Sequence, residues 1–186
     1  MTLALLAATL AARAQSGAAA PAENWKIDPT HTEIDFSIDA IGYPKTQGQF
    51  RKFEGRIAIN LDRPEKSSVA FHVQTGSVDV GSTTFSDYLR SAAFLDAARY
   101  PSIDFVSTSV TKINDREIRV SGALTLLGVT KPLSVEVTVT PLASAGRRFA
   151  FHADAKIDRL AFGMNSGFPL VSREVSLRIS SEASAL

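Results

Sequence analysis

GALTLLGVTKPLSVEVTV, residues 122–139, carries the clearest structural pattern in the chain. Apolar and polar residues alternate on both sides of a short interruption at 127–132. Alternation with a period of two is typical of a half-buried β-strand, and Gly128 can supply the positive φ angle that a tight turn requires. The stretch therefore predicts a β-hairpin with one aliphatic face, which either packed protein or an apolar ligand must cover.

The same alternation recurs after Trp25, so that eight strands are expected. Turn residues separate them at 62–64, 114–115 and 141–146. Successive strands joined by short turns run antiparallel, and a meander with one apolar face can close on itself and lose its exposed edges. The sequence thus predicts an all-β fold, an eight-stranded antiparallel barrel. The apolar positions of the strands include Ile34, Phe36, Ile57, Ile59, Val69, Phe71, Ile103, Phe105, Leu124, Leu126, Leu133, Val135, Phe149, Phe151, Val175 and Leu177.

One interval, STTFSDYLRSAAFLDAARYP at residues 82–101, loses the alternation. Ser82 or Thr83 is placed to cap a helix that carries apolar residues at three-to-four spacing, and a second short turn is expected over Leu95 to Ala98. We expect this helical excursion between strands three and four, where it would cover one end of the barrel. A second irregular segment, residues 162–174, is expected between strands seven and eight.

Composition excludes several functions. The chain has no cysteine, which removes disulfides, thiolate metal sites and cysteine nucleophiles. No apolar stretch reaches the roughly 18–20 residues that cross a bilayer, so stable membrane insertion is not expected. Basic and acidic residues are nearly equal in number and are scattered, with 20 and 19 respectively. A nucleic-acid partner needs a concentrated positive surface and is therefore not expected.

The N-terminus is typical of a secretory signal peptide. An apolar run from Leu3 to Ala12 is followed by a small-x-small pattern. We expect cleavage after Ala14, with Ala20 as the alternative site, and hence an exported protein. An Ala-rich tail without a targeting role is the competing interpretation. Residues 15–24 then form a linker, and residues 25–186 form the barrel domain.

Catalytic and metal-binding patterns are weak. Alternation directs His72 and His152 outward on separate strands, and His31 lies in a turn, Asp28 to Thr32, where a structural role is expected. No histidine pair has helical i, i+4 spacing, which gives a metal site little support. The glycines around 163–167 lack the strand–turn–helix context of a nucleophile elbow. The sequence predicts no catalytic residue, no metal and no cofactor.

Several stretches together resemble the bacterial YceI-like family of lipocalin-like, polyisoprenoid-binding periplasmic proteins. The resemblance covers about residues 25–182 in order. Two positions depart from the family pattern, because the family often has histidine where this chain has Tyr88 and Leu127. The resemblance therefore does not specify which head group the ligand carries. The stretches that carry the resemblance are WKIDPTHTEIDFSI, GQFRKFEGRIAI, SDYLRSAAFLDAARYPSIDF, VSGALTLLGVTKPLSVEV and IDRLAFGMN.

The resemblance implies a lipocalin-like barrel that holds a long apolar chain along its axis. The implied function is non-catalytic binding, transport or storage of a long-chain isoprenoid lipid, which would be the only bound group. Fatty-acid or fatty-amide binding is an alternative. Two further alternatives are an enzyme that acts on a hydrophobic substrate, with His31 or Tyr88 as acid–base group, and a packed module without a cavity. The sequence does not specify the oligomeric state, and a homodimer is one of the alternatives.

Inward-facing apolar residues are the candidates for lining such a tube. Small residues at Gly122, Ala153 and Ala155 are expected to leave room beside the aromatic rings. Arg159 is interpreted as a contact with the ligand. The competing interpretation is an ion pair that fixes the following loop. The lining candidates are Phe36, Phe71, Phe105, Leu124, Leu126, Val135, Phe151, Phe162, Met164 and Leu177. The head-group candidates are Tyr88, Arg90, Arg159 and His31.

Overall fold

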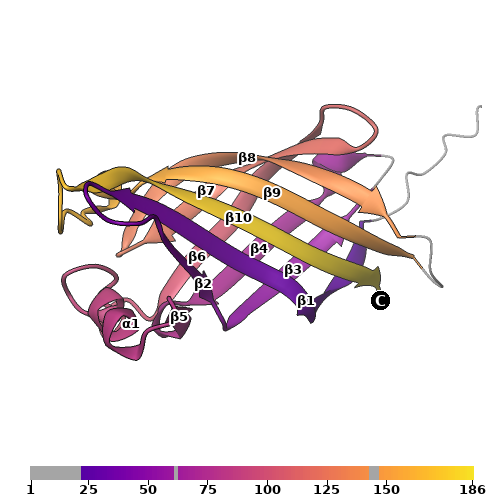
Figure 1. Cartoon of the computed structure of the whole chain (residues 1–186). Helices are drawn as coiled ribbons and strands as arrows, with labels where there is room; N and C mark the ends of the chain where they lie inside the picture. The colour runs from indigo at the N-terminus through magenta and orange to yellow at the C-terminus, as the bar shows by residue number, and fades with distance from the viewer. Residues whose placement is uncertain (1–21, 61–62, 143–146) are drawn as a thin grey trace, which may run out of the picture.

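The strands form one continuous antiparallel sheet that curls until its first and last strands meet (Figure 1). The computed structural model describes residues 22–60, 63–142 and 147–186. The predicted leader, most of the linker, residue 62 of one predicted turn and residues 143–146 of another lie outside them. The strands are β1 (Glu23–Ala40), β2 (Thr46–Phe50), β3 (Phe53–Ile59), β4 (Ser68–Gln74), β5 (Val78–Asp79), β6 (Ser102–Lys112), β7 (Glu117–Leu126), β8 (Val129–Pro141), β9 (Arg148–Asp158) and β10 (Val171–Ala185).

The predicted eight-stranded barrel is confirmed, although ten strands are assigned. β2 and β3 are one strand interrupted at Arg51 and Lys52, since both pair antiparallel with β1. β4 and β5 are likewise one strand, broken by the short 3-10 helix η2 (Thr75–Ser77), and they pair with β3 and β2. The eight resulting strands follow each other around the barrel in chain order, and the β10–β1 pairing closes it.

The hairpin at residues 122–139 forms as β7 and β8. Leu126 pairs with Val129 across a two-residue turn, in which Leu127 has φ +52° and Gly128 has φ +72°. Positive φ at both central residues defines the turn type that matches the twist of antiparallel strands. The predicted interruption is shorter than expected, because β8 already includes Thr130 to Pro132.

The turn expected before the first strand is instead a bulge inside it. Asp28 pairs with Glu182, but the next pair is Glu33 with Ser180, so four residues of β1 lie opposite one residue of β10. This odd shift reverses the alternation of side chains along β1. As a result, odd-numbered residues such as Trp25 are buried before the bulge and even-numbered residues such as Ile34 are buried after it.

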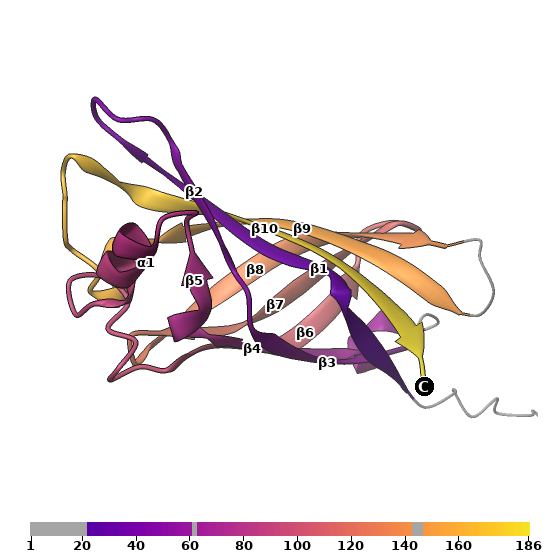
Figure 2. The ribbon, with the colours of Figure 1, turned by 60° about the horizontal axis from the view of Figure 1, so that its bottom comes forward.

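Short helices lie at the barrel ends. Helix α1 (Thr83–Arg90) is capped by Ser82, whose hydroxyl accepts a hydrogen bond from the Phe85 backbone N–H. This confirms one of the two predicted caps. The second short turn expected over Leu95 to Ala98 corresponds to two turns, at 92–95 and 97–99. Figure 2 shows α1 at the same end as the β1–β2 hairpin and the β9–β10 loop, both of which project beyond the barrel. The remaining 3-10 helices are η1 (Pro64–Lys66) and η3 (Arg159–Phe162).

Two apolar clusters lie inside the barrel, one toward each end. The larger one, near α1, includes Ile34, Phe50 and Leu124, and the smaller one contains Trp25, Ile27, Ile57 and Ala183. Partly buried aromatic side chains pack against both clusters. Side chains of the two clusters thus cover the inner wall of the barrel, and the space between the clusters is available for a cavity.

Gly122 in β7 does not leave the free space that the sequence suggested. A Cβ atom at this position would collide with the Val106 carbonyl oxygen and with the Phe105 ring, whose Cζ would lie 2.6 Å away. Phe105 therefore occupies the room that the missing side chain creates. The expectation that Gly122 adds to a cavity is wrong, because a neighbouring aromatic ring fills the gap across the strand pair.

We predict that Gly122→Ala destabilises the barrel by about 1–3 kcal/mol, because the carbonyl oxygen is backbone and cannot move aside cheaply. Gly76→Ala is the matched control, since nothing lies within 4 Å of a Cβ at that position. Urea denaturation of both variants measures the difference. Equal unfolding free energies for the two would show that β6 and β7 can shift apart without cost.

Candidate ligand-binding cavity

The barrel encloses a cavity of about 880 Å³. Its lining includes Tyr43 and Phe85 at the α1 end and Pro64 and Asn114 at the opposite end, so the cavity extends along the long axis of the barrel. Cavities that bind small molecules typically measure roughly 300–1,000 Å³. The space is therefore large enough for a ligand, and its length suits a chain better than a compact molecule.

Aliphatic and aromatic side chains from the inward faces of the strands form most of the wall. Phe162, which the sequence placed on the lining, is 6% exposed and does not border the cavity. Whether the lining residues contact a ligand stays a prediction. The other predicted residues do line the cavity: Phe36, Phe71, Phe105, Leu124, Leu126, Val135, Phe151, Met164 and Leu177.

Ala153 and Ala155 face the cavity from the middle of β9. Their neighbours on β9 in the wall are Phe151 and Ile157, both much larger. Ala153 pairs with Val137 of β8 and Ile179 of β10, whose side chains also face the cavity. The methyl groups at these two positions thus widen the tube where three strands meet, as the sequence suggested, whereas the same suggestion for Gly122 is wrong.

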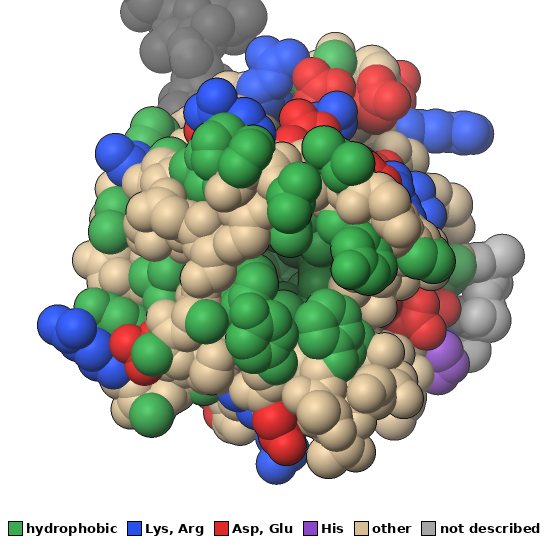
Figure 3. All heavy atoms as spheres, turned by 60° about the vertical axis from the view of Figure 1, so that its left-hand side comes forward, with side chains coloured by type: hydrophobic (Ala, Val, Ile, Leu, Met, Phe, Trp, Pro, Cys, Tyr) green, Lys and Arg blue, Asp and Glu red, His purple; other side chains and the backbone are tan. Residues whose placement is uncertain are grey.

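The α1 end forms the mouth of the cavity. Tyr43, Phe85 and Tyr88 belong both to the cavity lining and to the exposed surface. Figure 3 looks at this end and shows hydrophobic side chains gathered around a central hollow. Of the three, only Tyr88 was singled out from the sequence as a ligand contact. Tyr43 lies in the turn between β1 and β2, where the alternation that identifies inward residues does not apply.

The opposite end is polar. Lys112 donates to Asp115 at 2.7 Å, and the Asn114 side-chain amide donates to Glu117 at 2.6 Å. All four side chains lie around the β6–β7 turn and border the cavity. None of the four head-group candidates from the sequence lies at this turn, so the sequence analysis missed this second set of polar groups at the other end of the tube.

Two of the head-group candidates lie on α1. Tyr88 is 51% exposed at the mouth, and its ring meets those of Phe85 and Phe94. Arg90 lies outside the cavity lining and donates to the backbone carbonyl oxygens of Gly76 and Val78 at 2.8 and 2.6 Å. Arg90 therefore joins the helix to the β4–β5 break, while Tyr88 borders the cavity at its mouth.

Arg159, the third candidate, is only 1% exposed. Its guanidinium donates to four backbone carbonyl oxygens, at distances of 2.6 to 2.9 Å. Burial lowers the pKa of this group, although an arginine stays protonated in proteins. The expected ion pair is not what holds the loop, because carbonyl oxygens take the place of a carboxylate. These acceptors belong to Met164, Ser166, Val171 and Ser172.

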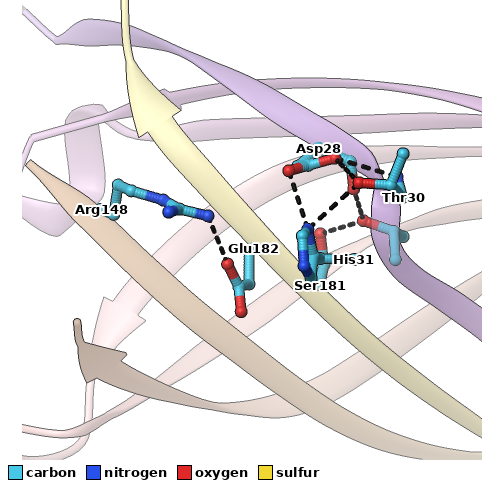
Figure 4. Close-up of polar contacts among 7 residues, drawn as sticks. Asp28, Thr30, His31, Arg148, Ser181 and Glu182 are labelled. Atoms are coloured by element: carbon cyan, nitrogen blue, oxygen red, sulfur yellow. Dashed lines mark hydrogen bonds and ion pairs between the residues drawn. The ribbon is translucent and has the colours of Figure 1, made fainter. Parts of the chain in front are cut away.

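His31, the fourth candidate, lies in the β1 bulge, outside the cavity lining. Its Nδ1 atom is 2.9 Å from a carboxylate oxygen of Asp28, and the Thr30 hydroxyl and backbone N–H donate to the other oxygen at 2.6 and 2.9 Å (Figure 4). The Thr32 hydroxyl lies 2.8 Å from that of Ser181 across the strand pair. These contacts close the bulge and fix its shape.

Hydrogen bonds from Thr30 and then from His31 hold the pKa of Asp28 far below its ordinary value of 3.8. A depressed folded pKa contributes stability that is present above the unfolded pKa and lost as pH falls through the folded pKa. We therefore expect the free energy of unfolding to fall on acidification below about pH 4. Asp28→Ala should lower the free energy of unfolding at pH 7, and the difference in this free energy between variant and wild type should become smaller in acid.

Urea denaturation of Asp28→Ala at pH 7 and in acid checks this expectation, with Glu33→Ala, an exposed acid on the same strand, as the control. A gap that stays constant from neutral to acid pH would contradict the role given to the carboxylate.

The other two histidines lie on the outer face, as predicted. His72 pairs with Asp104 at 2.6 Å, and His152 lies 3.2 Å from Asp154. None of the described histidines borders the cavity. Within residues 22–60, 63–142 and 147–186, no group of three or more histidine, aspartate or glutamate side chains could hold a metal ion. No helix in the same ranges is long and apolar enough to cross a membrane.

A closed antiparallel barrel of eight strands with an elongated apolar cavity is a lipocalin-like barrel, the class of small barrels whose interior can hold one ligand. The sequence model of the YceI-like domain matches residues 25–183. The chain belongs to the YceI-like family. Protein YceI of Escherichia coli O6:H1 is 36% identical over 187 residues, which cover 98% of this chain and 97% of that protein.

Solved structures share the fold. BcnA of Burkholderia cenocepacia superposes with a TM-score of 0.78 at 24% identity, over 86% of this chain and 100% of that one. A polyisoprenoid binding domain from Saccharophagus degradans gives a TM-score of 0.70 at 14% identity, over 87% of this chain and 98% of that one. These two solved structures therefore share the overall fold of the described part of this chain.

Proposed function

We propose that the protein binds one long-chain isoprenoid lipid inside the barrel and carries or stores it without chemical change. The observation that carries this proposal is the cavity of about 880 Å³, which extends along the barrel axis between apolar walls. A prenyl chain has no hydrogen-bonding groups, so its affinity must come from apolar burial. At roughly 25 cal/mol per Å², a few hundred Å² of buried chain gives several kcal/mol before ordering costs.

Family membership supports the ligand class. The solved domain from Saccharophagus degradans is a polyisoprenoid binding domain, and this chain has the same barrel. The apolar side chains that form most of the cavity wall support the binding of an apolar ligand. A periplasmic location rests on the signal-peptide pattern of residues 1–14.

Native mass spectrometry of the protein purified from its own host tests the proposal. We expect a retained ligand whose masses differ by isoprene units. A single acyl mass would instead identify a fatty-acid or fatty-amide binder. A protein that carries no ligand and also fails to take up a fluorescent isoprenoid probe would overturn the proposal.

A further inference from the structure

Large apolar side chains gather on the surface at the mouth of the cavity. Among the described residues, nine large hydrophobic side chains are exposed, and six of them lie at this end. They come from the β1–β2 hairpin, from α1 and from the β9–β10 loop, three segments far apart in the sequence. We call this set the apolar rim: Ile41, Tyr43, Phe85, Tyr88, Phe168 and Leu170, which are between 39% and 77% exposed.

Two of the three segments of the apolar rim are joined to each other, and the third carries a pair of stacked rings. The Ile41 backbone N–H donates to the Leu170 carbonyl oxygen at 2.8 Å, which ties the hairpin to the β9–β10 loop. On α1, the rings of Phe85 and Tyr88 stack with their centroids 6.3 Å apart. The rim thus consists of a hairpin and loop that are held together and of a stacked pair of rings on α1, and hydrophobic side chains surround the hollow at this end (Figure 3).

Charges beside the apolar rim are neutralised in pairs. Lys45 lies 3.4 Å from Asp39 at the base of the hairpin, and Arg90 lies 2.7 Å from Asp87 on α1. Arg173 pairs with Asp158 at the β9–β10 loop. The rim therefore presents apolar and aromatic groups without a strong net charge, which suits a neutral, apolar partner better than a charged one.

We propose that the apolar rim docks on the surface of a lipid bilayer and opens the cavity directly into it. Tyrosine and other amphipathic aromatic residues are enriched where proteins meet the membrane interface. The hairpin and the loop project beyond the barrel next to each other at the α1 end (Figure 2), so their apolar tips can enter the lipid while the barrel stays in water.

A second copy of the chain fits the rim less well. A stable protein interface usually takes about 20–30 residues on each side, far more than the six of the rim. The hairpin and the loop also project beyond the barrel and offer no flat face for another rigid barrel, whereas a fluid lipid surface adapts to them.

Docking has a consequence for loading. Tyr43, Phe85 and Tyr88 are shared by the rim and the cavity wall, so an apolar chain can pass from the bilayer into the barrel without crossing water. This transfer route rests on the proposed function, because it requires a lipid as the ligand. Docking itself does not require one and can be measured separately.

Flotation of the full chain with neutral phosphatidylcholine vesicles tests docking. We expect the wild type to float with the vesicles equally at low and high salt. The double variant Ile41→Ser/Leu170→Ser should bind roughly 100-fold more weakly, because two exposed side chains lose their apolar surface. Neither residue lines the cavity. Val106→Ser/Ile113→Ser, which changes two exposed residues away from the rim, is the control and should bind like the wild type.

Three outcomes would overturn docking: no flotation of the wild type, equal flotation of the rim variant, or flotation that needs anionic lipid and disappears in salt. Sedimentation velocity covers the remaining alternative, since a dimer that forms without lipid and is lost in the rim variant would identify a second copy as the partner.

Uptake assays separate docking from the proposed function. The rim variant should take up a fluorescent isoprenoid from detergent micelles as well as the wild type does, but should extract it from vesicles about tenfold more slowly or worse. Uptake from neither source by the wild type would refute the proposed function and leave the flotation result standing. Equal extraction by both proteins would refute the transfer route.

Discussion

Ala153→Phe should abolish the binding of a long-chain lipid while the barrel still folds. Ala153 faces the cavity from β9, opposite inward residues of β8 and β10. A phenyl ring there would take the place of several carbons of the bound chain. At about 0.8 kcal/mol per buried CH₂, the loss of four carbons costs about 3 kcal/mol, or roughly 100-fold in Kd. Titration with a fluorescent isoprenoid measures the change.

Thr138→Phe is the matched control for this variant. Thr138 is exposed on the outer face of β8, next to Val137, the residue that pairs with Ala153. This variant carries the same phenyl ring on the outer side of the barrel wall. The affinity of the variant for the probe should therefore equal that of the wild type. Unchanged binding by Ala153→Phe, with circular dichroism showing a folded barrel, would place the ligand elsewhere.

Arg159→Met should destabilise the protein by about 3–5 kcal/mol. The substitution keeps the apolar stem but removes the donors of four backbone carbonyl oxygens around the η3 turn and the β9–β10 loop. Buried acceptors left without a donor cost much more than the net value of the bonds. Urea denaturation measures the loss, and hydrogen exchange should show that residues 164–172 lose protection first.

Arg173→Met is the control for Arg159. Arg173 is 63% exposed and pairs with Asp158 on the surface next to the same loop. Exposed ion pairs are worth about 0–1 kcal/mol, so this variant should remain close to the wild type. Arg159→Lys should fall between the two, because one ammonium group cannot reach all four carbonyl oxygens. A near-neutral Arg159→Met would mean that water replaces the guanidinium without cost.

The barrel could be predicted from the sequence because alternation repeats in almost every strand. Along β8, for example, Leu133, Val135, Val137 and Val139 all face inward, as their spacing requires. The β1 bulge could not be predicted, since an odd shift changes which residues face inward without changing the local pattern. Trp25 is buried only because the shift lies between it and Ile34.

The cavity wall was easier to predict than its ends. Inward residues of regular strands follow from parity, but the space at Gly122 depends on the rotamer of Phe105, a residue of another strand. The carbonyl oxygens that surround Arg159 come from a loop whose path the sequence does not specify. Tyr43 and Leu170 lie in turns, where no periodicity indicates the direction of a side chain.

The most direct test is a crystal structure of the protein after incubation with a long-chain isoprenoid lipid. We expect continuous tubular density along the barrel axis, in contact with Phe36, Phe71 and Leu177. An interior closed by the protein's own aromatic rings, with no continuous space from the mouth to the β6–β7 end, would contradict the account.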